Sequence, residues 1–181
     1  MAEIALRVAA QDRLSFRMAR IYSELEATTV IAAIGEGRVR GLPPCGDLSP
    51  DTVWSCSHIV ALMGHDPIVA ALEAGAEVVL AGRATDTSMV AAVALMHGMP
   101  AGPTWHAAKT VECGGQCTTN PAAGGVFVRI DNQGFTVTPL APDAACTPTS
   151  VAAHMLYENA DPFRLLEPTG SSPTPPSCQN R

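Results

Sequence analysis

The chain has 181 residues, of which 47% are hydrophobic, 4% aromatic and 15% charged, and its formal net charge at pH 7 is −6. This length is enough for one domain with a core, which Ala, Val, Leu, Ile and Met must supply. No cluster of Lys or Arg occurs, so we expect no nucleic-acid partner, because affinity for phosphate backbones accumulates from cationic contacts. No apolar run reaches the roughly 18 residues that span a bilayer, and no signal peptide is recognised, so we expect no membrane association.

Six cysteines are scattered along the chain, at Cys45, Cys56, Cys113, Cys117, Cys146 and Cys178. Without a secretion signal, such a pattern is typical of reduced thiols rather than of a disulfide framework. We therefore expect a cytoplasmic protein.

The first third of the chain predicts short elements joined by loops. Residues 16–22 favour a strand, and residues 23–34 a helix ended by Gly35 or Gly37, although a Thr-Thr-Val-Ile run within it is also compatible with a strand. Ser49-Pro50-Asp51 predicts a short helical turn toward Trp54. Residues 57–62 form either a strand or a loop on the ligand side of the sheet.

Residues 66–98 organise the chain as helix, strand, loop and helix. Asp66 and Pro67 suit the start of a helix, and Gly75 suits the position just beyond its end. Residues 77–81 are an apolar run that predicts a strand buried on both faces. Residues 88–96 are apolar almost all round, which predicts a buried helix.

Three polar residues follow that strand: Arg83, Asp86 and Thr87. Ligands of open α/β sheets bind beyond the carboxyl ends of the strands, and helix N-termini favour anions. Arg83 offers a planar fork suited to a carboxylate or phosphate. The structural alternative is that Thr85 or Asp86 caps the next helix while Arg83 pairs with Asp86.

A second helix with reactive side chains is predicted over residues 104–113, ended by Gly114-Gly115. His106, Lys109 and Cys113 lie on one face of it, at i, i+3 and i+7. Imidazole carries protons near neutral pH, and an ammonium holds an anion. Cys113 is a poor nucleophile here, because the helix dipole at a C-terminus opposes a thiolate. A solvated or interface face is the alternative.

Metal and cofactor signals are weak. Cys113 and Cys117, with His106 upstream, provide one C-x₃-C pair, and the second pair typical of zinc sites is missing. We therefore predict no metal site. No G-x-G-x-x-G or G-x-x-x-x-G-K-[ST] motif supports a nicotinamide, flavin or ATP cofactor, so the cofactor is left unassigned.

The last third predicts a β-hairpin, a helix and a tail. Residues 125–140 alternate around Asp131-Asn132-Gln133-Gly134, where Gly134 can take a positive φ. Thr149 or Ser150 caps a helix to about residue 158, with Ser150 and His154 on one face. A Ser–His catalytic pair lacks the nucleophile-elbow motif. Residues 171–181 are polar and proline-rich, which predicts a disordered tail.

Four blocks of sequence, in this order, carry a resemblance to one family: His58-Ile59-Val60 with Met63-Gly64, then Ala81-Gly82-Arg83-Ala84-Thr85-Asp86-Thr87, then His106-Ala107-Ala108-Lys109 with Glu112-Cys113, and Cys146-Thr147-Pro148-Thr149-Ser150-Val151-Ala152-Ala153-His154. They resemble the acyclic terpene utilisation family over residues 20–170. Its members are encoded beside genes for citronellol, geraniol and branched-acid catabolism. They are typically longer, with a glycine-rich N-terminal portion, so the resemblance implies a truncated member.

The resemblance also implies site residues. It adds His58 to the catalytic candidates His106 and Lys109, and it adds Thr147, Ser150 and His154 to the substrate-binding candidates Arg83, Asp86 and Thr87. The family supplies a metabolic setting and not a mechanism. Arg83 with Asp86 and His106 with Lys109 are groups that orient a carboxylate and move a proton beside a carbonyl, so the expected function is an enzyme, lyase- or hydratase-like, that binds an acyl thioester or carboxylate. The alternative is a non-catalytic fragment or subunit that functions only within a homo-oligomer or with a partner subunit.

The predicted elements together indicate an α/β fold. We expect residues 1–170 to form a single domain or partial domain with three or four strands in a mostly parallel sheet, flanking helices and an appended β-hairpin. An α+β arrangement is the alternative.

Overall fold

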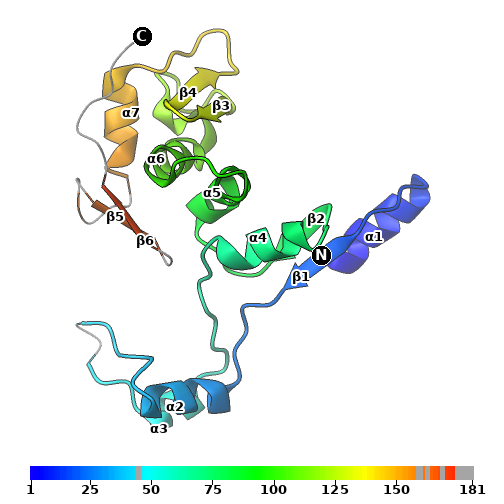
Figure 1. The fold of residues 1–181 in the computed structure, drawn as a ribbon, viewed down its shortest axis with the longest axis vertical. Coiled ribbons are helices and arrows are strands. Elements are labelled where there is room, and N and C mark those ends of the chain that lie inside the picture. Colours follow the sequence, from blue (N-terminus) through cyan, green and yellow to red (C-terminus); the bar gives the residue numbers. More distant parts are fainter. Residues whose placement is uncertain (44–45, 158–160, 162–163, 168–169, 174–181) are drawn as a thin grey trace.

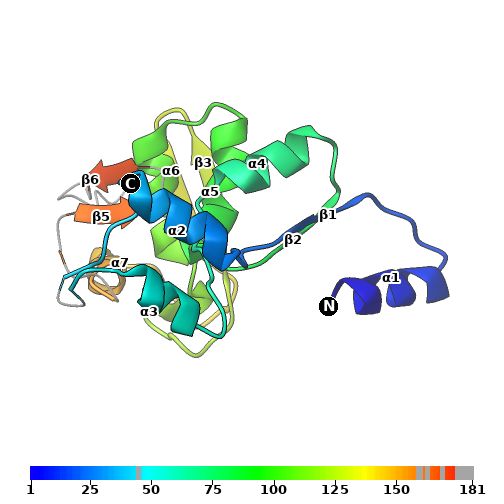
Figure 2. The same ribbon diagram turned by 90° about the horizontal axis from the view of Figure 1, so that it is seen from below.

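A computed structural model describes residues 1–43, 46–157, 161, 164–167 and 170–173 of the chain. Its elements spread in an open arrangement (Figure 1). Helix α1 (Ala2–Gln11) projects away from the other elements, as Figure 2 shows most clearly. Helices α2 (Ala27–Gly35) and α3 (Pro50–Ser55) pack together as a lobe of their own. The remaining elements build the body of the molecule.

Strands β1 (Met18–Ile21) and β2 (Val78–Ala81) pair in parallel, with Met18 opposite Val78 and Ile21 opposite Ala81. Helix α4 (Asp66–Glu73) packs on this pair. Its N-cap is His65, one residue before the predicted cap. Gly75 follows the helix with φ of 88°, as predicted, and a Cβ there would lie 2.7 Å from Arg17 Nη1.

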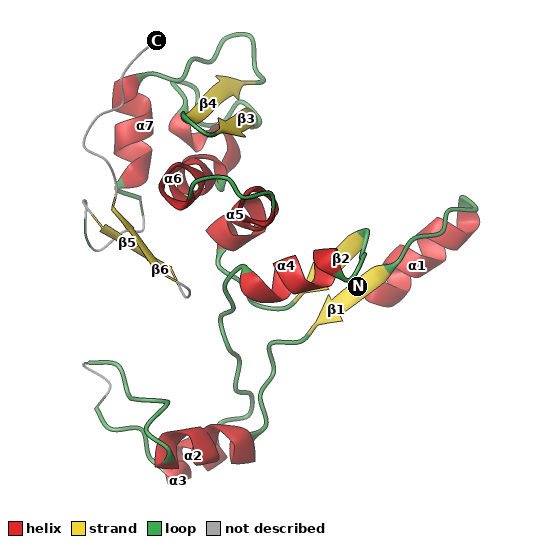
Figure 3. Cartoon of the chain, in the orientation of Figure 1, coloured by secondary structure: helices red, strands yellow, loops and turns green. Residues whose placement is uncertain are grey.

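The described strands form three separate pairs, drawn in yellow in Figure 3. Mixed helices and strands are therefore present, as an α/β or α+β fold requires, but a mostly parallel sheet is not confirmed. Residues 57–62, which were candidates for a further strand, contribute only an isolated bridge between Val60 and Glu24. Burial of a strand on both faces requires a packed layer on each side of the sheet. Strand β2 is not buried in this way as predicted: Val78 is exposed and its other residues are only partly buried.

Helices α5 (Asp86–Met96) and α6 (Ala101–Val111) pack together and form the centre of the body. Their shared core contains Ala91, Trp105 and Ala108. The prediction that α5 is buried on all sides is wrong: Met89 and Val93 are 59% and 48% exposed. Only one face of α5 contacts α6, so an apolar helix surface remains in solvent.

A short 3₁₀ helix η1 (Gly114–Cys117) follows α6 and leads to the predicted hairpin of β3 (Val126–Asp131) and β4 (Gly134–Pro139). Asp131 Oδ1 accepts hydrogen bonds from the backbone N–H groups of Gln133 at 2.8 Å and Gly134 at 3.0 Å. The expected positive φ at Gly134 is absent. The Asp131 carboxylate therefore holds the turn instead.

Helix α7 (Pro148–Met155) lies beside η1 and α6. Strands β5 (Arg164–Glu167) and β6 (Gly170–Pro173) pair antiparallel. Part of the region expected as a tail is thus in β6, while residues 174–181 lie outside the described residues. Most of the predicted helix stop at residues 159–162 also lies outside them. Among the helices in the described ranges, none has the length and apolar character needed to cross a membrane.

Candidate functional site

The first candidate region lies at the carboxyl ends of β1 and β2, in what we call the strand-end loops (residues 22–25, 58–63 and 82–86). Backbone hydrogen bonds tie the three loops together, from Ala61 N–H to the Ser23 carbonyl at 2.8 Å and from Met63 N–H to the Arg83 carbonyl at 3.0 Å. The buried Ser23 hydroxyl accepts from the Arg83 N–H at 2.5 Å. A Cβ on Gly82 would lie 1.9 Å from Ser23 Oγ, so only glycine permits this approach.

The charged residues predicted for the strand ends do lie in or beside these loops, and they are exposed. Arg83 and Asp86 form no ion pair with each other or with any other residue the structure describes, so the alternative in which they pair is wrong. His58 Nδ1 lies 2.7 Å from Glu24 Oε1, also at the surface. Thr87 is buried, and its hydroxyl donates to Thr85 Oγ1 at 3.2 Å, so it supports the helix start.

The second candidate region is built from Lys109, Glu112, Cys113, His154 and Tyr157, which we call the α6–α7 cluster. Lys109 Nζ donates to Glu112 Oε1, and the two side chains are only 5% and 6% exposed. The ammonium also lies 5.9 Å from the centroid of the Tyr157 ring. Burial of a charge is costly unless it is paired, so this ion pair fixes both side chains in place.

His154 links the cluster to the backbone of α6. Its Nε2 lies 3.1 Å from the Lys109 carbonyl oxygen, which can only accept, so Nε2 carries the proton and Nδ1 the lone pair. The ring stacks on Tyr157, with centroids 6.1 Å apart and an interplanar angle of 19°. Burial lowers the pKa of His154; the hydrogen bond to Lys109 raises it, and the Lys109 charge lowers it further. A neutral imidazole with one defined lone pair results.

A pocket of about 530 Å³ opens beside the cluster, between α7 and the segment that follows α6. Its volume falls within the roughly 300–1,000 Å³ typical of small-molecule sites. The lining residues are Gln116, Thr118, Pro121, Ala122, Ser150, Ala153, His154 and Tyr157. Ser150 and His154 therefore do share one face of α7, as their spacing predicts, and that face is turned to a cavity.

Thr147 and Ser150 have a structural role at the start of α7. Thr147 is the N-cap, not Thr149 or Ser150 as the sequence suggested, and it forms a capping box with Ser150. The Ser150 hydroxyl also donates to the Cys117 carbonyl at 2.8 Å. Its lone pair and proton are thus engaged with backbone groups, which anchors α7 to η1.

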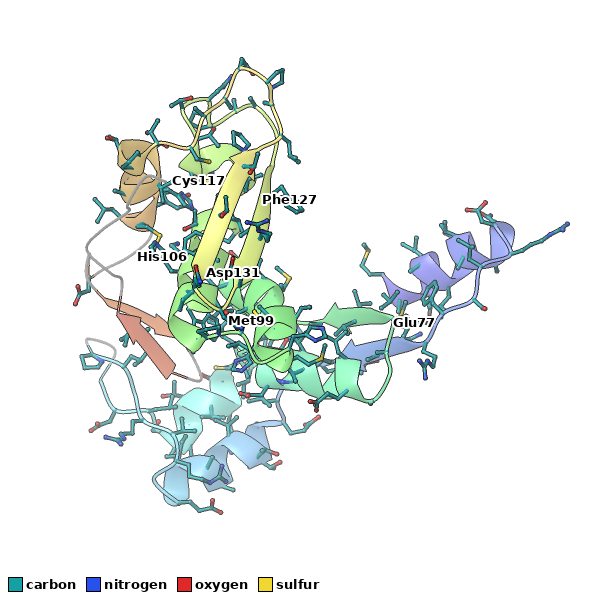
Figure 4. The ribbon with its side chains drawn as sticks, turned by 45° about the horizontal axis from the view of Figure 1, so that its top comes forward. Glu77, Met99, His106, Cys117, Phe127 and Asp131 are labelled. Carbon is teal, nitrogen blue, oxygen red and sulfur yellow. The ribbon has the colours of Figure 1, made fainter. Side chains whose placement is uncertain are left out.

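The side chains of His106 and Lys109 have different neighbours, although both residues lie on α6. Its ring contacts Phe135 of β4 at 5.0 Å, edge to face, and Figure 4 shows exposed Phe127 on the outer side of the hairpin, away from His106. His106 Nε2 is buried and has no hydrogen-bond partner in the described part of the chain. Burial lowers the pKa of His106. The alternative of a solvated face does not hold for α6, which is covered on several sides, by α5, the hairpin, η1, α7 and β6.

The structure does not bring Cys113 and Cys117 together as a C-x₃-C metal site would, because each has different neighbours. Cys113 Sγ, a Glu112 carboxylate oxygen and a His154 ring nitrogen all lie within 4.8 Å of one another, in an arrangement able to hold a metal ion. Cys117 Sγ instead donates to the Gly114 carbonyl at 3.7 Å. Burial, together with the neighbouring Cys146, raises the pKa of the Cys117 thiol to about 11. Cys56, Cys113, Cys117 and Cys146 form no disulfide within the part of the chain that the structure describes. Cys45 and Cys178 lie outside the described residues.

Sequence reasoning missed Glu112, Tyr157 and Gln116. A signal for Glu112 was available, because it stands three residues after Lys109, a spacing at which opposite charges pair on a helix. Tyr157 stands three residues after His154, which places both on one side of the same turn. Gln116 gives no signal in the sequence, since it lies in a glycine-rich loop.

Comparisons with known proteins agree with the four sequence blocks. Residues 1–170 match the family model described as acyclic terpene utilisation family protein AtuA, so the match extends nearer the N-terminus than the likeness over residues 20–170 indicated. No curated protein and no solved structure matches the chain. The chain therefore belongs to the acyclic terpene utilisation family.

Proposed function

We propose that this protein is a cytoplasmic enzyme of terpene or branched-chain acid catabolism that binds a carboxylate or an acyl thioester in the α7 pocket. The observation that carries this proposal is a pocket lining that combines polar and apolar side chains. The polar residues are Gln116, Thr118, Ser150 and His154, and the apolar contacts are Pro121, Ala122, Ala153 and the ring of Tyr157. A short branched acyl chain with a polar head matches this combination.

His154 is the reactive group of this proposal. A lyase- or hydratase-like reaction needs a group that accepts or directs a proton beside a carbonyl. The Lys109 carbonyl fixes Nε2–H of His154, so Nδ1 supplies the free lone pair of a side chain that lines the pocket. Ser150 holds α7 in place rather than reacting, because its hydroxyl is bonded to Cys117 and Thr147.

Thermal unfolding with a panel of branched carboxylates and acyl-CoAs tests the proposal, since a ligand that binds the folded state raises the melting temperature. The decisive variant is Ala153→Phe, which fills the pocket with an aromatic ring. Ala152→Phe, next to it on the exposed part of α7 and outside the pocket lining, is the matched control. We expect a ligand-induced shift in the parent and in Ala152→Phe that is lost in Ala153→Phe. A shift equal in both variants would exclude the pocket.

A subunit role is the second candidate, and exposed apolar surface favours it. The chain exposes 11767 Å², whereas a compact monomer of its mass exposes about 8,300 Å². Large apolar side chains contribute, among them Tyr22 (77% exposed), Trp54 (62%) and the Met89–Val93 face of α5. Apolar surface in this amount is more than a soluble monomer usually exposes, and a partner would cover it.

Light scattering across a range of protein concentrations separates the two candidates. A mass that rises with concentration, and falls back in a Met89→Lys/Val93→Glu double variant, would support the subunit role. A constant monomer mass together with ligand binding would favour an autonomous enzyme.

A further inference from the structure

The α6–α7 cluster combines the three ligand types of a transition-metal site at one point. Glu112 and Cys113 are consecutive residues where α6 ends, and His154 reaches them from α7. Their donor atoms already lie within 4.8 Å of one another. We propose that these three residues bind a divalent transition metal of the zinc type, with a fourth position open to the α7 pocket.

The hydrogen bond of His154 is the independent observation in favour of a metal. Metal-binding histidines usually donate the second ring N–H to a carbonyl or carboxylate, which fixes the tautomer and the ring plane. His154 makes this contact through Nε2 to the Lys109 carbonyl, at 3.1 Å. Nδ1 is then the ligand atom, and the ring is held in position before any metal arrives. With a metal bound, His154 would no longer accept a proton, and a metal-bound hydroxide would take over that role in the proposed function.

The surrounding structure supports the two ligand-bearing segments. The Ser150 hydroxyl bonds the Cys117 carbonyl at 2.8 Å and so joins α7 to η1, directly beyond Cys113. Lys109 Nζ bonds a Glu112 carboxylate oxygen, and metal-bound carboxylates commonly have such an outer partner. Little rearrangement is needed beyond closing the donor atoms onto an ion at roughly 2.0–2.3 Å.

The donor set selects the metal. Thiolate and imidazole favour zinc and similar ions over magnesium or calcium, which prefer oxygen ligands. Three protein ligands with an open fourth position are typical of catalytic rather than structural zinc. His154 lines the pocket, so water or a substrate oxygen can reach that position from there.

Charge balance connects the metal with the proposed substrate class, and in this respect the inference deepens the proposed function of the same pocket. Lys109 and Glu112 cancel each other when no metal is bound. Metal binding displaces the Cys113 thiol proton into solvent. The divalent ion, thiolate, carboxylate and ammonium together then carry one net positive charge. A carboxylate, or hydroxide derived from water, is the fourth ligand that this charge favours.

Cobalt(II) titration of tag-free protein, with a non-thiol reductant, tests the proposal directly, because a thiolate ligand gives cobalt a charge-transfer band in the near ultraviolet. We expect one equivalent to bind with this band in the parent and in Cys56→Ser, whose exposed thiol is the matched control. Cys113→Ser loses the band. Glu112→Gln, which keeps the shape of the side chain, weakens cobalt binding by more than the ~10–100-fold caused by losing an outer-shell partner.

Two results would overturn the proposal: no thiolate band in the parent, or a band that survives in Cys113→Ser but disappears in Cys146→Ser. Glu112→Gln keeps the test open if Cys113→Ser does not fold. Ala153→Phe separates this inference from the proposed function, since it blocks the pocket and leaves the three ligands in place. Cobalt binding without acyl binding in the parent would refute the proposed function alone, and the reverse would refute the metal alone.

Discussion

The strand-end loops and the α6–α7 cluster hold polar groups in opposite ways. In the strand-end loops the backbone provides the order, while Arg83, Asp86 and His58 extend into solvent. In the cluster, Lys109, Glu112 and His154 are largely buried and bond one another or the backbone. Electrostatic interactions are stronger in the low dielectric of a buried site and are screened at a surface. Removing a charge from the cluster should therefore change both stability and chemistry. Removing a charge from the strand-end loops should change the free energy of unfolding very little.

The largest expected effect follows from breaking the buried ion pair. Lys109→Met removes the cation that neutralises the buried Glu112 carboxylate, which should lower the free energy of unfolding by about 3–5 kcal/mol. Urea unfolding measures the change. The double variant Lys109→Met/Glu112→Gln should recover much of the loss, because no uncompensated charge remains.

The exposed ion pair between Arg38 Nε and Glu36 Oε2, at 2.6 Å, is the matched control. Its side chains are largely solvated, so Arg38→Ala should change the free energy of unfolding by no more than about 1 kcal/mol. Equal losses in Arg38→Ala and Lys109→Met would contradict the contrast between buried and exposed charge.

The next effect tests the packing of the strand-end loops. Gly82→Ala places a Cβ 1.9 Å from Ser23 Oγ, in a position fixed by backbone hydrogen bonds. We expect a loss of about 1–3 kcal/mol in urea unfolding, as for other overpacked sites. Gly35→Ala on α2 is the control, because a Cβ there meets nothing within 4 Å. It should stabilise the chain by about 0.5–1 kcal/mol; the same loss at both positions would argue against a steric cause.

A third prediction concerns pH. Burial lowers the pKa of His106 below its ordinary value of 6.5, so the unfolded chain takes up this proton at a higher pH than the folded chain. The contribution to stability is complete above pH 6.5 and is lost as the pH falls through the folded-state value. Urea unfolding between pH 8 and pH 5 should show a smaller decline in His106→Leu than in the parent, after the packing change is subtracted at pH 8. An unchanged decline would mean that His106 is accessible to water.

Local patterns in the sequence predicted much of the fold. The parallel strands, α4 with Gly75 and the hairpin register all depend on short-range periodicity and turn residues, and they lie close to their predicted positions. The mostly parallel sheet of three or four strands that we expected from these patterns is not confirmed. Whether residues 57–62 join a sheet depends on long-range contacts that periodicity does not contain, and they contribute only an isolated bridge at Val60.

In the candidate site, too, local spacing predicted some features correctly and long-range contacts decided the others. Helical spacing correctly placed Ser150 and His154 on one face of α7, yet it placed His106 and Lys109 together although they face different neighbours. Residues that share a face of an isolated helix share an environment in the fold only where a single neighbouring element covers that face. Helix α6 is covered on several sides, so residues three apart enter different environments.

The smallest expected effect on stability, and the sharpest test of which region binds ligand, is Arg83→Ala. Arg83 is exposed and forms no ion pair with the described residues, so its loss should change the free energy of unfolding by less than about 0.5 kcal/mol. If the α7 pocket is the site, the thermal shift caused by a carboxylate should persist in Arg83→Ala and vanish in Ala153→Phe. If the guanidinium holds the carboxylate at the strand ends, the two variants should behave in the reverse way. Because Arg83→Ala leaves folding intact, a lost shift there could only mean lost ligand contact, and the strand-end loops would then replace the pocket as the site.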